Sequence, residues 1–127
     1  MSFLLEDFVS VESVTEYRSL EPGDHIAVAG EQNGVEYYHH GIFISHKEGI
    51  IEFGGPDKRR AKVRRVDLFQ FIDFGRRRLV RIKYSAGQCL PPEVVVQEAK
   101  ELLENPHRWG PFDMIGNNCE HFATKCN

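Results

Sequence analysis

Several features common in other protein classes are scarce or missing from this chain of 127 residues. It has three cysteines and no CxxC pair, so a disulfide framework is not predicted. No apolar stretch approaches the roughly 20 residues that cross a bilayer, and the N-terminus lacks a secretory pattern. We therefore expect a single domain with free thiols, in the cytoplasm or at the cytoplasmic face of a membrane.

The net charge is only −3, but the cationic residues are concentrated in one segment. Residues 58–83 hold eleven of the sixteen Lys and Arg residues, whereas the first 36 residues hold eight acids. This asymmetry favours attraction to an anionic surface such as phospholipid head groups; the alternative is a solvated loop and strand. Nucleic acid is disfavoured, because the basic run lacks interleaved aromatic residues. The candidate membrane-binding residues are Arg59, Arg60, Arg64, Arg65, Arg76, Arg77 and Arg78.

Turn signals and hydrophobic periodicity predict an α+β fold, a small antiparallel sheet packed against helices on one face. Residues 1–20 are expected to form an irregular or partly helical leader before a domain at 21–127. Asp67 is expected to cap a short helical turn, and Pro92 to open the clearest helix. The expected strands contain Ile26 and Val28, then 36–45, 49–53 and 79–84; the expected helices are 68–73 and 92–104.

The strand expected at 36–45 carries two adjacent histidines that alternation places on opposite faces. His39 shares a face with Gly41 and Phe43, whereas His40 lies on the other face. A strand beginning at Gly49 follows a short loop, and antiparallel pairing of the two strands can bring Glu52 beside His39. An imidazole–carboxylate pair between these two strands is therefore compatible with the sequence, and the alternative for Glu52 is an edge carboxylate that faces water.

Cys119 is a candidate nucleophile. Asn117 and Asn118 are good N-cap residues, and the apolar residues after them recur at helical spacing. A thiol in the first turn of such a helix is favoured as thiolate, the attacking form. The alternative is a small buried hydrophobic residue. A zinc site is not predicted, because the close ligand pairs are only His39-His40 and Cys119-x-His121.

Three segments together resemble the lecithin–retinol acyltransferase-like family: Tyr38-His39-His40-Gly41-Ile42-Phe43-Ile44, Gly49-Ile50-Ile51-Glu52-Phe53 and Asn118-Cys119-Glu120-His121-Phe122. The resemblance implies a permuted papain-like topology, with His39 as general base and Cys119 as nucleophile. The third polar residue of the family, commonly a second histidine, falls on Glu52 if the turn here is one residue longer. A carboxylate can also orient an imidazole, so thiol chemistry is retained.

The resemblance further implies a thioester acyl-enzyme on Cys119, with the backbone N–H of Cys119 among the oxyanion donors. A glycerophospholipid acyl ester is the implied donor, for phospholipase A or N-acyltransferase activity, and no cofactor is implied. Two alternatives remain. One is a cysteine peptidase or amidase, and the other is a catalytically inert, membrane-associated interaction module.

Overall fold

The computed structural model describes residues 10–32, 35–54, 62–73, 75–83 and 90–105. The strands and helices follow in chain order as β1 (Ser10–Ser13), the 3-10 turn η2 (Tyr17–Ser19), β2 (His25–Gln32), β3 (Val35–Ser45), β4 (Gly49–Gly54), β5 (Lys62–Val66), α1 (Leu68–Phe71), β6 (Leu79–Lys83) and α2 (Pro92–Glu104). The strands form one antiparallel sheet in the order β1-β6-β2-β3-β4-β5. The predicted α+β class and antiparallel sheet are confirmed.

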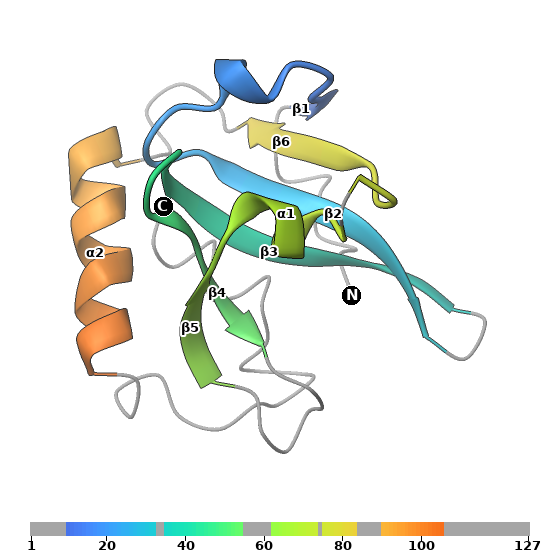
Figure 1. Cartoon of the computed structure of the whole chain (residues 1–127). Coiled ribbons are helices and arrows are strands. Elements are labelled where there is room, and N and C mark those ends of the chain that lie inside the picture. The colour runs from blue at the N-terminus through green and yellow to red at the C-terminus, as the bar shows by residue number, and fades with distance from the viewer. Residues whose placement is uncertain (1–9, 33–34, 55–61, 74, 84–89, 106–127) are drawn as a thin grey trace.

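The sheet is covered on both faces (Figure 1). Successive residues of its central strands point to opposite sides, so their apolar side chains form a core on each face. Ile42 of β3 packs with Val95 and Leu102 of α2 on one face. Phe43, the next residue, packs on the other face in a cluster that includes Phe71 of α1. The expectation that the helices share one face is therefore wrong. The physical reason is that β3 and β4 are apolar on both sides, so each side requires a cover.

The two helices begin where their sequences predict. The Asp67 carboxylate accepts a hydrogen bond from the Gln70 backbone at 2.8 Å, and the Gln70 side chain accepts one from the Asp67 backbone at 3.1 Å. This capping box starts α1. Pro92 occupies the first turn of α2, and Val95, Ala99 and Leu102 form its buried stripe. None of the helices in the described part of the chain is long and apolar enough to span a bilayer.

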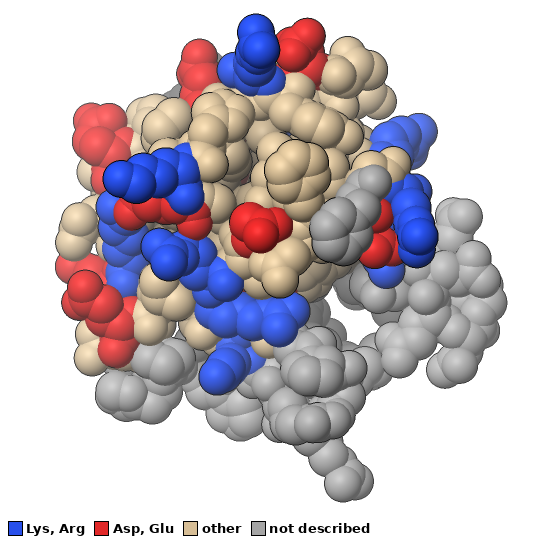
Figure 2. Space-filling view, viewed as in Figure 1, with Lys and Arg blue, Asp and Glu red and all other residues tan. Residues whose placement is uncertain are grey.

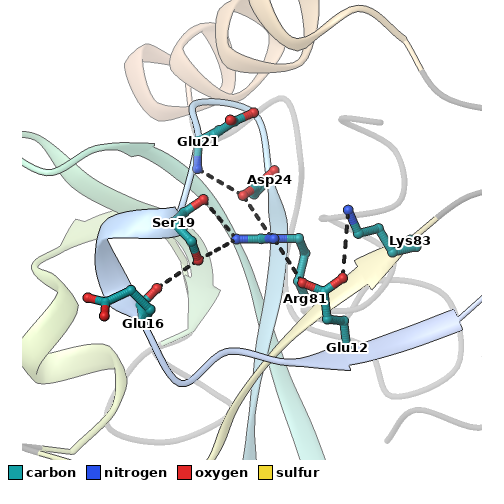
Figure 3. A network of polar contacts seen from close by, with 7 residues as sticks. All are labelled: Glu12, Glu16, Ser19, Glu21, Asp24, Arg81 and Lys83. Carbon is teal, nitrogen blue, oxygen red and sulfur yellow. Dashed lines mark hydrogen bonds and ion pairs between the residues drawn. The ribbon is translucent and has the colours of Figure 1, made fainter.

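Part of the segment expected to be an irregular leader belongs to the sheet. β1 pairs with β6, so Ser10–Ser13 extend the sheet by one edge strand. Arg81 of β6 holds this region together, as Figure 3 shows. Its guanidinium lies 3.1 Å from Glu12 and 3.0 Å from Asp24, and donates to the Ser19 carbonyl at 3.0 Å. One side chain thus joins β1, η2 and the turn before β2.

Candidate functional site

His39 and Glu52 form a hydrogen-bonded pair between two neighbouring strands. In the register of β3 with β4, Gly41 lies opposite Glu52 and both point to the face that carries His39. His39 Nε2 is 2.9 Å from Glu52 Oε1. The His39 side chain is 24% exposed and that of Glu52 only 3%. The imidazole is therefore reachable from outside, whereas the carboxylate behind it is enclosed.

The ionisation of Glu52 fixes which nitrogen of His39 carries the proton. Burial alone would raise the pKa of the Glu52 carboxyl, but the hydrogen bond and charge of His39, and then those of Arg64, lower the pKa below its usual value. An ionised carboxylate only accepts hydrogen bonds, so Nε2 of His39 must donate. In neutral His39, Nδ1 is then the basic nitrogen. The pair is arranged to present Nδ1 as a proton acceptor.

The other oxygen of Glu52 is bound by Arg64 from the next strand. Arg64 lies directly opposite Glu52 in the register of β4 with β5, and its Nε donates to Oε2 at 2.9 Å. The Arg64 side chain is 38% exposed, so part of it remains in contact with solvent while its Nε binds the enclosed carboxylate. Sequence reasoning assigned Arg64 to a basic surface and missed this contact.

Gly54 and Phe71 shape the space around the pair. A Cβ at Gly54 would lie 2.7 Å from Glu52 Oε2, closer than real Cβ contacts allow, and 3.0 Å from His39 Cε1, which is a tight contact. The ring of Phe71, at the end of α1, lies 5.6 Å from the His39 ring, centroid to centroid, at an angle of 39°. Gly54 leaves room for the carboxylate, and Phe71 supports the imidazole. The signal in the sequence is spacing, because Gly54 follows Glu52 by two residues and so shares its face.

His40 takes part in a second histidine pair on the other face of the sheet. Its Nδ1 lies 2.8 Å from Nε2 of His25 at the start of β2, and neither residue is more than 2% exposed. Burial lowers the pKa of His25 to about 3 and that of His40 well below its usual value, so both rings are neutral at physiological pH. One ring must donate and the other accept. Of the two adjacent histidines, only His39 is placed for proton transfer with solvent or substrate.

The chain is similar to proteins of one known family. The family model described as "Lecithin retinol acyltransferase" matches residues 18–127, most of the chain. The chain belongs to the lecithin retinol acyltransferase family.

A relative with a short region of similarity is Protein LEAD-SENSITIVE 1 of Arabidopsis thaliana, which is 42% identical over 50 residues. That alignment covers 35% of this chain and only 18% of the relative. No solved structure matches the chain.

The thiol expected of a lecithin retinol acyltransferase relative lies outside the described residues. Cys119 and its backbone N–H fall in the segment 106–127, and Arg59 and Arg60 fall in the segment 55–61. The catalytic roles of Cys119, His39 and Glu52 therefore stay predictions. Within the described ranges, no group of three or more His, Cys, Asp or Glu residues is arranged to hold a metal ion.

The candidate membrane-binding arginines that the structure describes fall into two groups. Arg65 of β5 is exposed, next to Arg64, and Figure 2 shows Lys and Arg side chains gathered around this part of the surface. The second group precedes β6, where Arg76 is exposed. Arg77 there donates to the Ala29 carbonyl at 3.2 Å, and Arg78 to the Tyr38 hydroxyl at 3.3 Å. Two of these arginines thus make contacts within the protein as well as carrying charge to its surface.

Proposed function

We propose that the protein is a thiol acyltransferase or hydrolase that acts through an acyl thioester on Cys119. The observation that carries this proposal is the His39–Glu52 pair, which offers an unprotonated Nδ1 in a chain that also contains the cysteine motif of its family. His39 is the general base, Glu52 orients it, and Cys119 is the nucleophile. The topology that this implies is the permuted papain-like one, in which the base precedes the nucleophile along the chain.

The proposed reaction has two steps. Nδ1 of His39 takes the proton from the Cys119 thiol, and the thiolate attacks the carbonyl carbon of an ester. The backbone N–H of Cys119 stabilises the oxyanion, a contribution of about 3 kcal/mol per donor in comparable sites. The bond from the carbonyl carbon to the alcohol oxygen breaks, and the imidazolium returns the proton to this leaving group. Water or an amine then attacks the thioester, giving hydrolysis or acyl transfer.

We propose a glycerophospholipid as the acyl donor. The family indicates acyl chemistry, and the cationic residues Arg64, Arg65 and Arg76, with Arg59 and Arg60 in the neighbouring segment, provide charge that attracts an anionic phospholipid surface. Peripheral binding to the cytoplasmic face of a membrane follows from this proposal. Each cationic residue near such a surface contributes roughly 1 kcal/mol, an effect that decreases with salt.

Mass spectrometry of the intact protein tests the proposal. The full chain is incubated with vesicles of phosphatidylcholine and phosphatidylserine, with Cys119→Ser and Cys89→Ser as matched variants. We expect an acyl adduct that hydroxylamine removes, that maps to Cys119 and that survives Cys89→Ser. Absence of the adduct across vesicle compositions and pH values would contradict a phospholipid donor.

A second candidate is a peptidase or amidase that uses the same residues. Glu52 stands where the family commonly has a histidine if the turn before β4 is one residue longer here, and an imidazole–carboxylate pair with a thiol also serves amide hydrolysis. Digestion of a peptide library separates this candidate from the lipid enzyme. A catalytically inert, membrane-associated module is the third candidate, and iodoacetamide labelling near neutral pH addresses it. An inert module predicts that Cys119 reacts no faster than Cys89.

A further inference from the structure

Glu52 is bound at both of its oxygens, and its two partners come from different strands. His39 of β3 binds Oε1 and Arg64 of β5 binds Oε2, each at 2.9 Å. The three side chains lie side by side across β3, β4 and β5, because Arg64 is directly opposite Glu52 and His39 is two residues from the partner of Glu52 on the other side. Glu52 therefore connects a partly exposed imidazole to a cation on the edge strand β5.

The second hydrogen bond restricts a rotation that the first one leaves open. The terminal torsion of a glutamate side chain is broad, so a carboxylate bound at one oxygen can turn about its last bond. Arg64 fixes the other oxygen through an Nε–H that is itself part of a rigid planar group. With both oxygens bound, the lone pairs of Oε1 stay directed at His39 Nε2. The orientation of the imidazole, and hence of Nδ1, depends on this restraint.

The two partners also differ in when they are charged. His39 has the larger share in lowering the pKa of Glu52, but its positive charge is absent in the neutral form that accepts a proton. Arg64 keeps its charge at every pH at which proteins fold. A carboxylate as enclosed as Glu52 tends to take up a proton when no cation is near. In the resting state, Arg64 is thus the permanent positive charge beside Glu52.

We propose that Arg64 is a positioning residue of the site, which acts through Glu52 to hold His39 as the Nε2–H tautomer with Nδ1 unprotonated. The catalytic meaning of this inference rests on the proposed function, but its structural content does not. The contrasting role for Arg64 is a surface ion pair of small energetic value, as expected for exposed pairs. That role predicts no effect on the tautomer of His39, so the two can be distinguished.

The experiment uses nitrogen NMR of the full chain to read the tautomer and the titration midpoint of His39. In Arg64→Gln we expect the Nε2–H population to fall and the midpoint to rise by about half a unit to one unit, because a positive charge near the imidazole is lost. Arg64→Lys retains the charge but not the planar donor, so the midpoint should stay near the original value while the tautomer ratio changes. Arg65→Gln removes a charge from the adjacent position of β5, which faces the other way, and its His39 spectrum should match the unmodified protein.

Turnover provides the second measurement. We expect kcat of Arg64→Gln to fall at least tenfold on a short, soluble acyl ester, with KM little changed, and Arg64→Lys to restore part of it. A dispersed amide spectrum shows that each variant is folded. An unchanged His39 tautomer in Arg64→Gln overturns the proposal, and so does unchanged kcat. If the unmodified protein turns over no acyl substrate, the proposed function fails, and the His39 spectrum alone then decides for or against Arg64.

Discussion

The two sides of β3 carry adjacent histidines in opposite surroundings. His39 is partly exposed and bound to an ionised carboxylate that a guanidinium also contacts. His40 is enclosed, with another imidazole as its partner at 2.8 Å. The first environment stabilises positive charge on a histidine, and the second opposes it. Chemical type alone therefore says little about function. The two residues differ in the charge of the neighbouring side chain, which is an ionised carboxylate for His39 and a neutral imidazole for His40.

The largest expected effect comes from replacing His39, the partly exposed histidine. His39→Gln should lower kcat by about a thousandfold, since loss of a general base typically costs 10²–10⁴ in rate. The free energy of unfolding should fall by about 1–3 kcal/mol, because the enclosed Glu52 carboxylate loses one of its two partners. Steady-state kinetics and urea unfolding measure the two quantities. A large loss of stability with intact turnover would reverse the roles assigned to the two histidines.

Lowering the pH should reveal how much the His25–His40 pair contributes to stability. His25 has a pKa of about 3 and that of His40 is also depressed by burial, while in the unfolded chain both lie near 6.5. The unfolded state therefore takes up protons first as the pH falls, so the stability from the neutral pair is complete above pH 6.5 and is lost toward pH 3. We expect the free energy of unfolding to decrease by roughly 1 kcal/mol or more per pH unit once the pH is below the unfolded value near 6.5. Urea titrations between neutral pH and about pH 5 measure it.

A variant with both rings replaced, His25→Leu with His40→Leu, is the control for this acid effect. It should show a clearly flatter dependence of stability on pH over the same interval. Glu52 remains in that variant, and its depressed pKa gives stability that is lost only as the pH falls below the usual glutamate range near 4.5. A pH dependence as steep as that of the unmodified protein would show that the pair is not responsible.

Removing one member of the enclosed pair should cost stability without affecting chemistry. His40→Leu deprives His25 Nε2 of the hydrogen bond it makes with this ring, and loss of a buried partner costs about 1–3 kcal/mol. The double replacement should cost less than the sum of the single ones, because no imidazole is then left without its partner. Chemical unfolding of the four proteins in this cycle measures the coupling. Additive losses would mean that the two rings contribute independently.

The smallest expected change concerns the space beside Glu52. Gly54→Ala places a methyl group where Glu52 Oε2 and His39 Cε1 lie, so we expect kcat to fall about tenfold with a stability change near 1 kcal/mol. Gly75→Ala is the matched control. Gly75 has a φ of +89° and no atom lies within 4 Å of the place a Cβ would take, so alanine there should cost about 1 kcal/mol by strain and leave kcat unchanged. Equal kcat in both variants would contradict the role given to Gly54.

The His39–Glu52 pair was expected from the family resemblance together with the antiparallel pairing of two strands joined by a short loop. Alternation alone does not fix this pair, because the register of β3 with β4 shifts between Phe43 and Ser45, and the sequence did not indicate that shift. The sequence did not indicate Arg64, because that contact depends on the register of β5, which is reached through a longer connection. It also did not indicate His25, whose contact with His40 is diagonal across two strands.

The face covered by each helix was also beyond sequence reasoning. The periodicity of α2 identifies its apolar stripe, but the side of the sheet that it meets depends on how the chain crosses after β6. Similarly, β1 has four exposed residues and no apolar alternation. It is a strand because β6 offers an unpaired edge, so its structure is set by a distant partner and not by its own residues.

The order of strands bears on how the molecule assembles. β2, β3, β4 and β5 pair in the order in which they occur, so each pairing closes a loop of few residues. β6 follows β5 in the chain but pairs with β2, at the opposite edge of this four-stranded unit, and among the described strands β1 pairs only with β6. Closing long loops costs more entropy and slows folding, so we expect the four-stranded unit to appear early and the β6–β1 ribbon late. His39, Glu52 and Arg64 all lie in the early unit, so the arrangement of these three side chains can form before the rest of the chain has folded.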